Sequence, residues 1–329
     1  MARRSNTSEL LRLLRATEEG GVLSGEQARR VLGVSRTAVW KQISSLRLAG
    51  YRIEAIPSQG YRLAGEPDLL HQEALRQALT GTAVVGRAIS CLSETVSTNA
   101  DAFRAAEEGA VEGTVVLADR QSGGKGRLGR RWESPAGVNL YCSVILKPNL
   151  APSEAPQLTF LSAVATARAI TAVTGLQPAI KWPNDLLLNG CKVAGLLNEM
   201  SAETDRISFV ILGIGVNLNM QAHQFPADLR SPATSLQLES GAPVSRLQFA
   251  AVLLQELDHE YARFLREGFD PVREEWSRLC NAAGRTVRVD MGTGLLQGLF
   301  HGLDRDGALL VRLPDGTLER VLSGDVILV

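Results

Sequence analysis

The chain has 329 residues, 45% of them hydrophobic and 21% charged, and its formal net charge is zero. The length predicts about two domains with ample chain for a core, and the composition is that of an ordinary soluble protein. No stretch approaches the roughly 18 apolar residues of a membrane helix, and the first residues lack a signal peptide's apolar run, so we expect a cytoplasmic protein.

The cysteines and histidines, four of each, are scattered along the chain. No two cysteines form a Cys-x-x-Cys pair, so we expect neither a disulfide framework nor a protein-ligated zinc ion, and a reducing compartment fits this pattern. The positions are Cys91, Cys142, Cys191 and Cys280, and His71, His223, His259 and His301.

The zero net charge hides an asymmetry between the two ends of the chain. Residues 1–65 carry eleven Arg or Lys and five Glu, a balance of +6, whereas the remaining residues carry 24 basic and 30 acidic side chains, a balance of −6. A basic head on an acidic body predicts that the head binds a polyanion.

The head, residues 1–65, is predicted to hold three helices and a β-hairpin. Ser24 and Ser35 are suitable N-cap residues, and Gly33 and Gly50 are suitable helix ends. Three helices followed by a hairpin predict a winged helix-turn-helix domain. The expected elements are helices over residues 9–16, 25–32 and 36–48 and a hairpin that joins 51–56 to 60–63.

The third predicted helix has one apolar and one polar face. Val39, Ile43 and Leu46 follow helical spacing and should face inward. An outward face with Arg, Thr and Lys fits a DNA major groove, so we predict DNA binding; a protein-interaction domain is the alternative. The candidate DNA-binding residues on this outward face are Arg36, Thr37, Trp40, Lys41 and Ser44.

Strands and helices alternate in the central segment, residues 66–279, after a linker at residues 66–68. No Gly-x-Gly-x-x-Gly motif opens a helix after the first strand, which argues against a Rossmann fold and favours an α+β architecture. The expected strands cover residues 114–118, 140–146 and 207–216, and the expected long helices cover 158–174 and 246–266.

A glycine-rich basic loop follows the first of these strands, at residues 121–132, with no carboxylate in it. Glycines let backbone amides approach a ligand and unpaired cations attract anions, so we predict a phosphate or carboxylate site; a solvated, flexible loop is the alternative. A P-loop is excluded, because neither the required earlier glycine nor a Ser or Thr after the lysine is present. The loop contains Gly123, Gly124, Lys125, Gly126, Arg127, Gly129, Arg130 and Arg131.

A hairpin is predicted around the Asn-Gly pair at residues 189–190, which lies between two apolar runs. A two-residue turn pairs Lys192 with Leu187. Strict alternation then places Lys192, Ala194 and Leu196 on one face of the strand and the intervening residues on the other. A lysine that leads an apolar strand is a candidate functional residue, and an edge lysine that only blunts aggregation is the alternative.

The last fifty residues, 280–329, are predicted to form short strands separated by tight turns. Asp-Gly at 306–307 and Pro-Asp-Gly at 314–316 are turn signals. Such spacing predicts a small β-barrel, although another small β module would fit equally. The expected strands cover residues 287–289, 295–300, 309–313 and 320–322.

Seven short motifs follow one another between residues 97 and 217. They are Ser-Thr-Asn at 97–99, the loop at 121–132, Ser-Pro at 134–135, Asn-Leu-Tyr at 139–141, Lys-Trp-Pro-Asn-Asp at 181–185, Lys-Val-Ala-Gly at 192–195 and Gly-Ile-Gly-Val-Asn at 213–217. In this order they resemble biotin–protein ligases, in the bifunctional bacterial form that also represses the biotin operon. The resemblance implies a catalytic core similar to class II aminoacyl-tRNA synthetases and an SH3-like C-terminal domain.

The resemblance also implies a reaction. ATP and Mg²⁺ would convert biotin to biotinyl-5′-AMP, and the biotin would pass to a lysine of the biotin carboxyl carrier domain of acetyl-CoA carboxylase. Two anions about 4 Å apart repel by roughly 4 kcal/mol at an effective dielectric near 20, so fixed cations must offset the approach of carboxylate to phosphate. Operator DNA and a ligand-promoted homodimer are further implied partners.

The resemblance assigns roles to individual residues of this sequence. Lys192 and Arg127 would be catalytic. The biotin-binding residues would be Ser97, Thr98, Asn99, Gln121, Gly124, Lys125, Lys192 and Gly195. The nucleotide-binding residues would be Arg127, Arg130, Trp132, Lys181, Asn184, Asp185 and Asn217, with the Trp132 indole near adenine.

The basic loop departs from the family pattern at one position. Lys125 stands where these ligases commonly have arginine, which keeps the charge but loses the bidentate fork, so we expect faster leakage of biotinyl-AMP. Three other functions stay open on the sequence: a lipoate–protein ligase, a biotin-sensing repressor without ligase activity, and a ligase whose head does not bind DNA.

Overall fold

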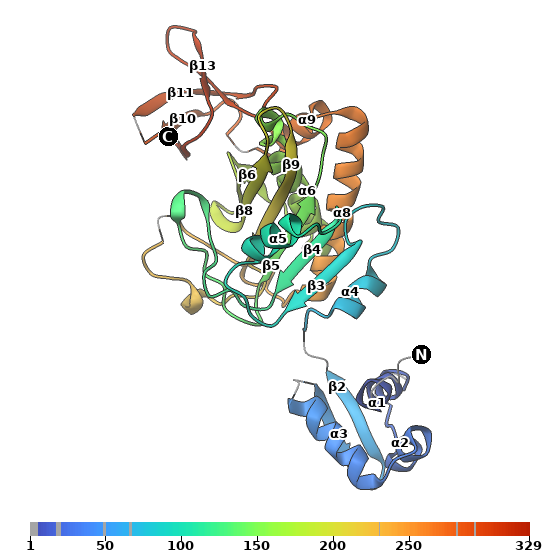
Figure 1. The fold of residues 1–329 in the computed structure, drawn as a ribbon. Coiled ribbons are helices and arrows are strands. Elements are labelled where there is room, and N and C mark those ends of the chain that lie inside the picture. Colours follow the sequence, from blue (N-terminus) through green and yellow to red (C-terminus); the bar gives the residue numbers. More distant parts are fainter. Residues whose placement is uncertain are drawn as a thin grey trace. The chain divides into compact units, whose positions relative to one another are not determined.

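The computed structural model describes residues 6–17, 21–48, 51–65, 68–229, 231–280, 282–292 and 294–329. The chain divides into two compact units, Met1–Asp68 and Leu69–Val329, and each is described by itself (Figure 1). Gly50 and most of the expected linker lie outside the described residues. None of the described helices is long and apolar enough to cross a membrane.

The N-terminal unit contains the predicted three helices and hairpin. Ser24 Oγ accepts a hydrogen bond from the Gln27 amide at 3.0 Å, and Ser35 Oγ accepts one from Ala38 at 3.2 Å, so both predicted N-caps are confirmed. The elements are α1 (Asn6–Arg15), α2 (Gly25–Leu32), α3 (Arg36–Leu48), β1 (Arg52–Ile56) and β2 (Gly60–Gly65), with β1 and β2 antiparallel.

The two faces of α3 are also as predicted. Val39, Ile43 and Leu46 are buried in the core of this unit. The indole of Trp40 is 56% exposed, which excludes a core role within this unit. Arg36, Thr37, Trp40 and Lys41 are exposed, and Ser44 is half-buried.

A seven-stranded mixed sheet organises the second unit. Its strand order is β3-β4-β5-β9-β8-β7-β6, and only β3 and β4 run parallel. The predicted α+β architecture is therefore confirmed. The strands are β3 (Ala88–Leu92), β4 (Thr114–Ala118), β5 (Leu140–Leu146), β6 (Ala179–Lys181), β7 (Asp185–Leu188), β8 (Cys191–Ala202) and β9 (Ile207–Val216).

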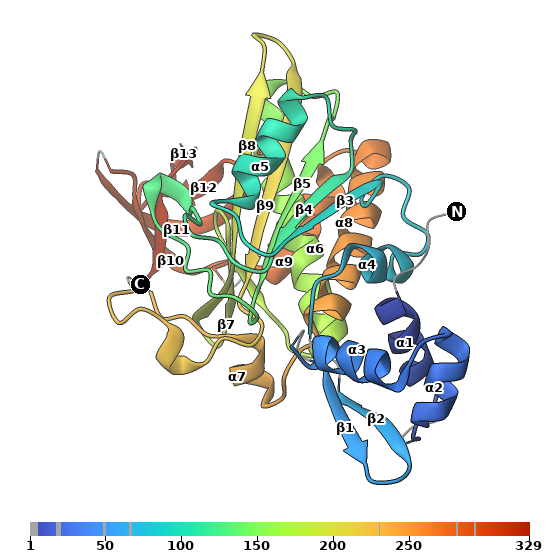
Figure 2. The ribbon, with the colours of Figure 1, turned by 60° about the horizontal axis from the view of Figure 1, so that its bottom comes forward.

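Helices cover both faces of this sheet (Figure 2). Helix α5 (Thr98–Glu107) packs on one face, where Phe103 meets Phe209 edge to face at 5.0 Å. Helices α6 (Gln157–Thr174) and α8 (Arg246–Glu267) lie behind the other face. The remaining helices of this unit are α4 (Gln72–Ala78), α7 (Leu236–Ser240) and α9 (Asp270–Leu279), with 3₁₀ turns at Arg127–Gly129, Pro152–Glu154 and Ala222–Gln224.

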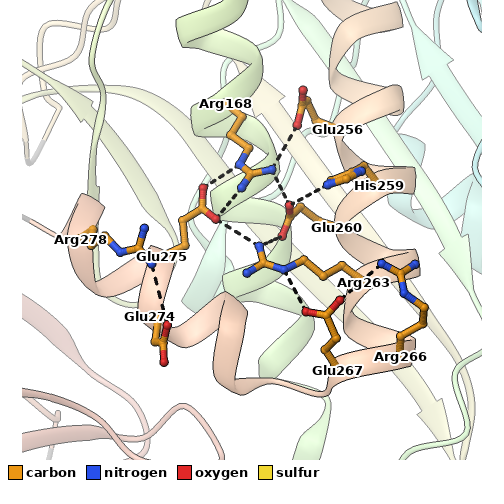
Figure 3. A network of polar contacts seen from close by, with 10 residues as sticks. All are labelled: Arg168, Glu256, His259, Glu260, Arg263, Arg266, Glu267, Glu274, Glu275 and Arg278. Atoms are coloured by element: carbon orange, nitrogen blue, oxygen red, sulfur yellow. Dashed lines mark hydrogen bonds and ion pairs between the residues drawn. The ribbon is translucent and has the colours of Figure 1, made fainter.

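A network of charged side chains joins α6, α8 and α9 (Figure 3). Arg168 Nη1 lies 2.7 Å from Glu260 Oε1, and its Nε donates to Glu275 Oε1 at 2.6 Å. The Glu260 side chain is fully buried, and burial raises the pKa of this carboxyl. Arg168 and Arg263 hold the pKa of Glu275 below its usual range against the cost of burial.

The C-terminal residues form an antiparallel five-stranded sheet in the order β13-β12-β11-β10-β14. It packs against α6 and α9, where Trp276 meets Phe160 and Phe300, and Trp182 Nε1 donates to Gly307 O at 3.3 Å. Strand β14 was not expected from the sequence. The bounds are β10 (Thr286–Asp290), β11 (Leu295–Leu303), β12 (Leu309–Arg312), β13 (Leu318–Val321) and β14 (Asp325–Leu328).

The hairpin between β7 and β8 confirms one prediction and corrects another. Lys192 pairs with Leu187 as expected, but the register then shifts, because Leu186 pairs with Ala194. Val193 is therefore the extra residue of a bulge, and the strict alternation predicted for this strand was wrong. Lys192 lies beside Gly195 instead of sharing a face with Ala194.

Candidate active site

One cavity of about 830 Å³ opens among the basic loop, strands β7, β8 and β9, and the C-terminal sheet. All predicted ligand-binding and catalytic residues line it except Gly124, a buried residue of the basic loop. The lining includes Ser97, Thr98, Asn99, Gln121, Lys125, Arg127, Arg130, Trp132, Lys181, Asn184, Asp185, Lys192, Gly195 and Asn217.

Glycines form the floor of the cavity, and the Trp132 indole lies on them. Gly195 and Gly215 are register partners on β8 and β9. A Cβ added to Gly215 would lie 2.7 Å from Trp132 Cε2, and one added to Gly195 would lie 2.9 Å from Cζ3. Only glycine permits this approach of an aromatic ring to the sheet.

Lys192 lies at the edge of this floor, held on two sides. Its Nζ lies 2.6 Å from Asp185 Oδ1 and 5.3 Å from the centroid of Trp132. Its backbone is fixed as well, since the Lys192 amide donates to Pro232 O at 2.8 Å and its carbonyl accepts from Thr234 at 2.9 Å. The Lys192 and Asp185 side chains are 27% and 24% exposed, so an anionic ligand can reach the ammonium.

The tip of the basic loop is fixed at two points. Arg127 Nη1 donates to Asn184 Oδ1 at 3.2 Å, and Arg130 binds Asp325 of β14 through both terminal nitrogens. Burial lowers the pKa of Arg127, against the opposing effect of Asp325 and Asp185. Between these arginines Leu128 adopts φ +57° and is 74% exposed.

The opposite end of the cavity is a closed polar network. Gln121 Oε1 accepts from the Thr98 amide at 2.9 Å, and Ser143 Oγ donates to Asn99 Oδ1 at 2.6 Å. Asn99 Nδ2 in turn donates to Glu199 Oε2 at 2.7 Å and to a main-chain carbonyl. Strands β5 and β8 thus orient the Thr-Asn pair through side chains that the sequence analysis missed.

A second buried network supports the cavity from behind. Arg246, whose side chain is fully buried, lies 2.7 Å from Asp119 Oδ1 and donates to Asn139 O at 2.9 Å. Asn139 Nδ2 donates to Asn217 Oδ1 at 3.3 Å, and Asn217 Nδ2 donates to Thr234 O at 3.1 Å. Asn217 lines the cavity, but its side chain mainly holds the strand that carries it.

Other residues that line the cavity, or that hold its lining in place, were not assigned from the sequence. Gly213 and Gly215 carry a usable signal, since glycines inside an apolar strand indicate close approach by another group. Ser143 and Glu199 carry none, because isolated polar residues in strands are common. The C-terminal sheet adds Asp290 and Asp325, which are register partners on β10 and β14.

The arrangement suits a ligand with anionic and apolar parts. Lys192, Arg127 and Arg130 offer cations, and the glycine floor with Trp132 offers an apolar slot. In the described part of the chain no group of three or more His, Cys, Asp or Glu residues could hold a metal ion.

Three family models match the chain. The Biotin/lipoate A/B protein ligase family matches residues 91–217, an HTH domain matches residues 6–62, and the biotin protein ligase C terminal domain matches residues 283–329. The first covers the loop, the hairpin and the glycine floor of the cavity, and the other two cover the basic head and the C-terminal sheet.

Full-length relatives and solved structures agree with these matches. The bifunctional ligase/repressor BirA of Bacillus subtilis is 38% identical over 304 residues, covering 92% of this chain and 93% of that protein. The Escherichia coli BirA is 31% identical over 316 residues and 96% of each chain. The Aquifex aeolicus biotin protein ligase in complex with biotin and ATP superposes with a TM-score of 0.62 at 29% identity, covering 74% of this chain and 99% of that one. The chain belongs to the biotin–protein ligase family, in the bifunctional ligase/repressor branch.

Proposed function

We propose that this protein activates biotin with ATP to biotinyl-5′-AMP, which releases diphosphate, and transfers the biotin to a lysine of a carboxylase carrier domain, which releases AMP. The observation that carries this proposal is the position of Lys192 at the edge of the glycine floor, with Arg127 and Arg130 on the neighbouring loop. An apolar slot beside fixed cations is what a carboxylate needs to meet a phosphate.

The individual roles are inferred from the family resemblance, and the contacts of these side chains support them. Lys192 holds the biotin carboxylate against the α-phosphate, and Asp185 orients the ammonium until the ligands arrive. The network of Thr98, Asn99 and Gln121 forms the polar end for the ureido ring, with Ser97 and Gly195 beside it. Gly124 and Lys125 close over biotin, while Arg127, Arg130, Trp132, Lys181, Asn184, Asp185 and Asn217 form the nucleotide side.

Several finer features belong to the same proposal. Mg²⁺ bound with ATP would neutralise charge on the nucleotide phosphates, and phosphate and water oxygens would be its ligands. The acceptor is the biotin carboxyl carrier domain of acetyl-CoA carboxylase, and the protein works in the cytoplasm. The central sheet belongs with the class II aminoacyl-tRNA synthetase cores, the C-terminal sheet is SH3-like, and the domain boundaries lie at residues 65/66 and 279/280.

Transfer of labelled biotin to a carrier domain, with ATP and Mg²⁺, tests the ligase. We expect ATP-dependent labelling in the wild type and a loss of about a hundredfold or more in Lys192→Ala. Lys147→Ala is a matched control, because Lys147 lies at the end of β5, outside the cavity lining. Binding of biotin without any labelling would instead favour a sensor, and labelling with lipoate in place of biotin would favour a lipoate ligase.

The basic head is proposed to bind operator DNA as part of a ligand-promoted homodimer, which matches a two-fold operator. Exposed Arg36, Thr37, Trp40 and Lys41 on α3 support this role, with Ser44 beside them. We expect Arg36→Ala and Lys41→Ala to abolish retention of biotin-operon promoter DNA, with steep salt dependence in the wild type and unchanged ligation. Equal loss of retention and ligation would contradict the assignment, and a monomer with and without ligand would contradict the dimer.

A further inference from the structure

Lys192 and Arg130 are cations of the cavity whose carboxylate partners lie in different parts of the fold. Lys192 of β8 is paired with Asp185 of the adjacent strand β7, within the same central sheet. Arg130 is paired with Asp325 of β14, in the C-terminal sheet, across 195 residues of sequence. The second pair therefore links the basic loop to a part of the fold that contains none of the expected site residues.

The loop has few other attachments at this point. Its 3₁₀ turn, Arg127–Gly129, contains no carboxylate, and Arg131 pairs only with Glu133 of the same segment among the ion pairs of the described residues. Arg127 contacts Asn184 through one hydrogen bond. Without Asp325, the tip would lose its only described ionic contact with another element of the fold.

The Arg130–Asp325 pair also leaves donors for a ligand. A guanidinium carries five N–H groups, and the contact with Asp325 occupies its two terminal nitrogens only in part. Arg130 remains 40% exposed and lines the cavity. Fixing the guanidinium beforehand removes part of the side-chain entropy that phosphate binding would otherwise cost.

We propose that Asp325 is a positioning residue for the nucleotide: it holds Arg130, and through it the loop tip, ready for the phosphates of ATP. The C-terminal sheet is thereby a working part of the nucleotide site. This inference rests on the proposed ligase function. Arg130 and Arg127, together with Lys181, keep the pKa of Asp325 below its usual range, so the pair is ionised at neutral pH.

The test compares Asp325→Asn with Asp290→Asn in the full-length protein. Asp290 is the register partner of Asp325 and lines the same cavity, but its described side-chain hydrogen bond is to Gly292, so this control removes an equal charge without releasing Arg130. Trypsin cleavage after Lys125, Arg127, Arg130 and Arg131, followed by mass spectrometry, reports loop mobility. The KM for ATP in the labelling assay reports nucleotide binding.

We expect Asp325→Asn to raise both the loop-cleavage rate and the KM for ATP by about two- to fivefold, the range of a half-exposed ion pair. Asp290→Asn should leave cleavage unchanged, and Asp325→Glu should restore most of both values. Equal loop-cleavage rates and equal KM values for ATP in Asp325→Asn and Asp290→Asn would overturn the inference. Faster cleavage of Asp325→Asn with an unchanged KM for ATP would overturn it as well. A wild type that labels no acceptor would instead overturn the ligase function, because loop cleavage does not depend on activity.

Discussion

Charged side chains cluster in two regions of the second unit, and they differ in burial. Behind the sheet, Arg168 binds Glu260, which is fully buried, and Glu275, which is 18% exposed, so these two carboxylates are largely withdrawn from solvent although the Arg168 side chain is 32% exposed. In the cavity, Lys192–Asp185 and Arg130–Asp325 are about a quarter to two-fifths exposed. An ion pair with a fully buried carboxylate therefore contributes mainly to stability, whereas a pair with both side chains partly exposed stays available to a ligand.

Breaking the charged network around buried Glu260 should give the largest change in the free energy of unfolding. We expect Arg168→Met to lower the free energy of unfolding by about 3 kcal/mol, because it leaves the buried Glu260 carboxylate with weaker compensation. Glu260→Gln should cost less, since burial already favours the neutral form of this side chain and raises its pKa. Urea denaturation measures both, and a loss in Arg168→Met no greater than in Glu260→Gln would contradict the assignment.

Substitutions in the cavity should change ligand affinity more than they change the free energy of unfolding. Gly215→Ala would place a Cβ 2.7 Å from Trp132 Cε2 and push the indole off the glycine floor. Because Trp132 is assigned to the nucleotide side, we expect ATP affinity to fall about tenfold, the equivalent of about 1.4 kcal/mol, by calorimetry. Gly294→Ala is the matched control, because nothing lies within 4 Å of its added Cβ. Unchanged ATP affinity in Gly215→Ala would show that the glycine floor does not shape the nucleotide site.

Lys125→Arg should give the smallest change. Lys125 is exposed at the cavity mouth, and an arginine there would restore the bidentate fork that the family commonly has. We expect release of biotinyl-AMP to slow by a few-fold in filter-binding chase experiments, with labelling rates nearly unchanged. Equal off-rates for wild type and variant would show that a bidentate guanidinium at this position does not help to retain biotinyl-AMP.

The parts predicted correctly depend on local sequence signals. The Asn-Gly turn set the Lys192–Leu187 pairing, and Ser24 and Ser35 set two helix starts, since each involves neighbours in the chain. The basic loop and the other short motifs likewise contain most of the residues that line the cavity.

The parts that were missed depend on contacts between distant segments. The bulge at Val193 changes the face of Lys192, and it arises where β8 pairs with both β7 and β9. Arg246 follows an N-cap serine, a position where an exposed arginine is expected, yet it is fully buried against Asp119. Asp325 lies on β14, a strand that was not predicted from the sequence.

The most direct test of the account is single-turnover formation of biotinyl-AMP, without acceptor, in wild type and Lys192→Ala. We predict a rate at least about a hundredfold lower in the variant, at an unchanged melting temperature, because Lys192 lies in the open region and offsets the repulsion between carboxylate and phosphate. Equal rates in the two proteins would contradict the claim that the cavity's exposed cation carries the chemistry.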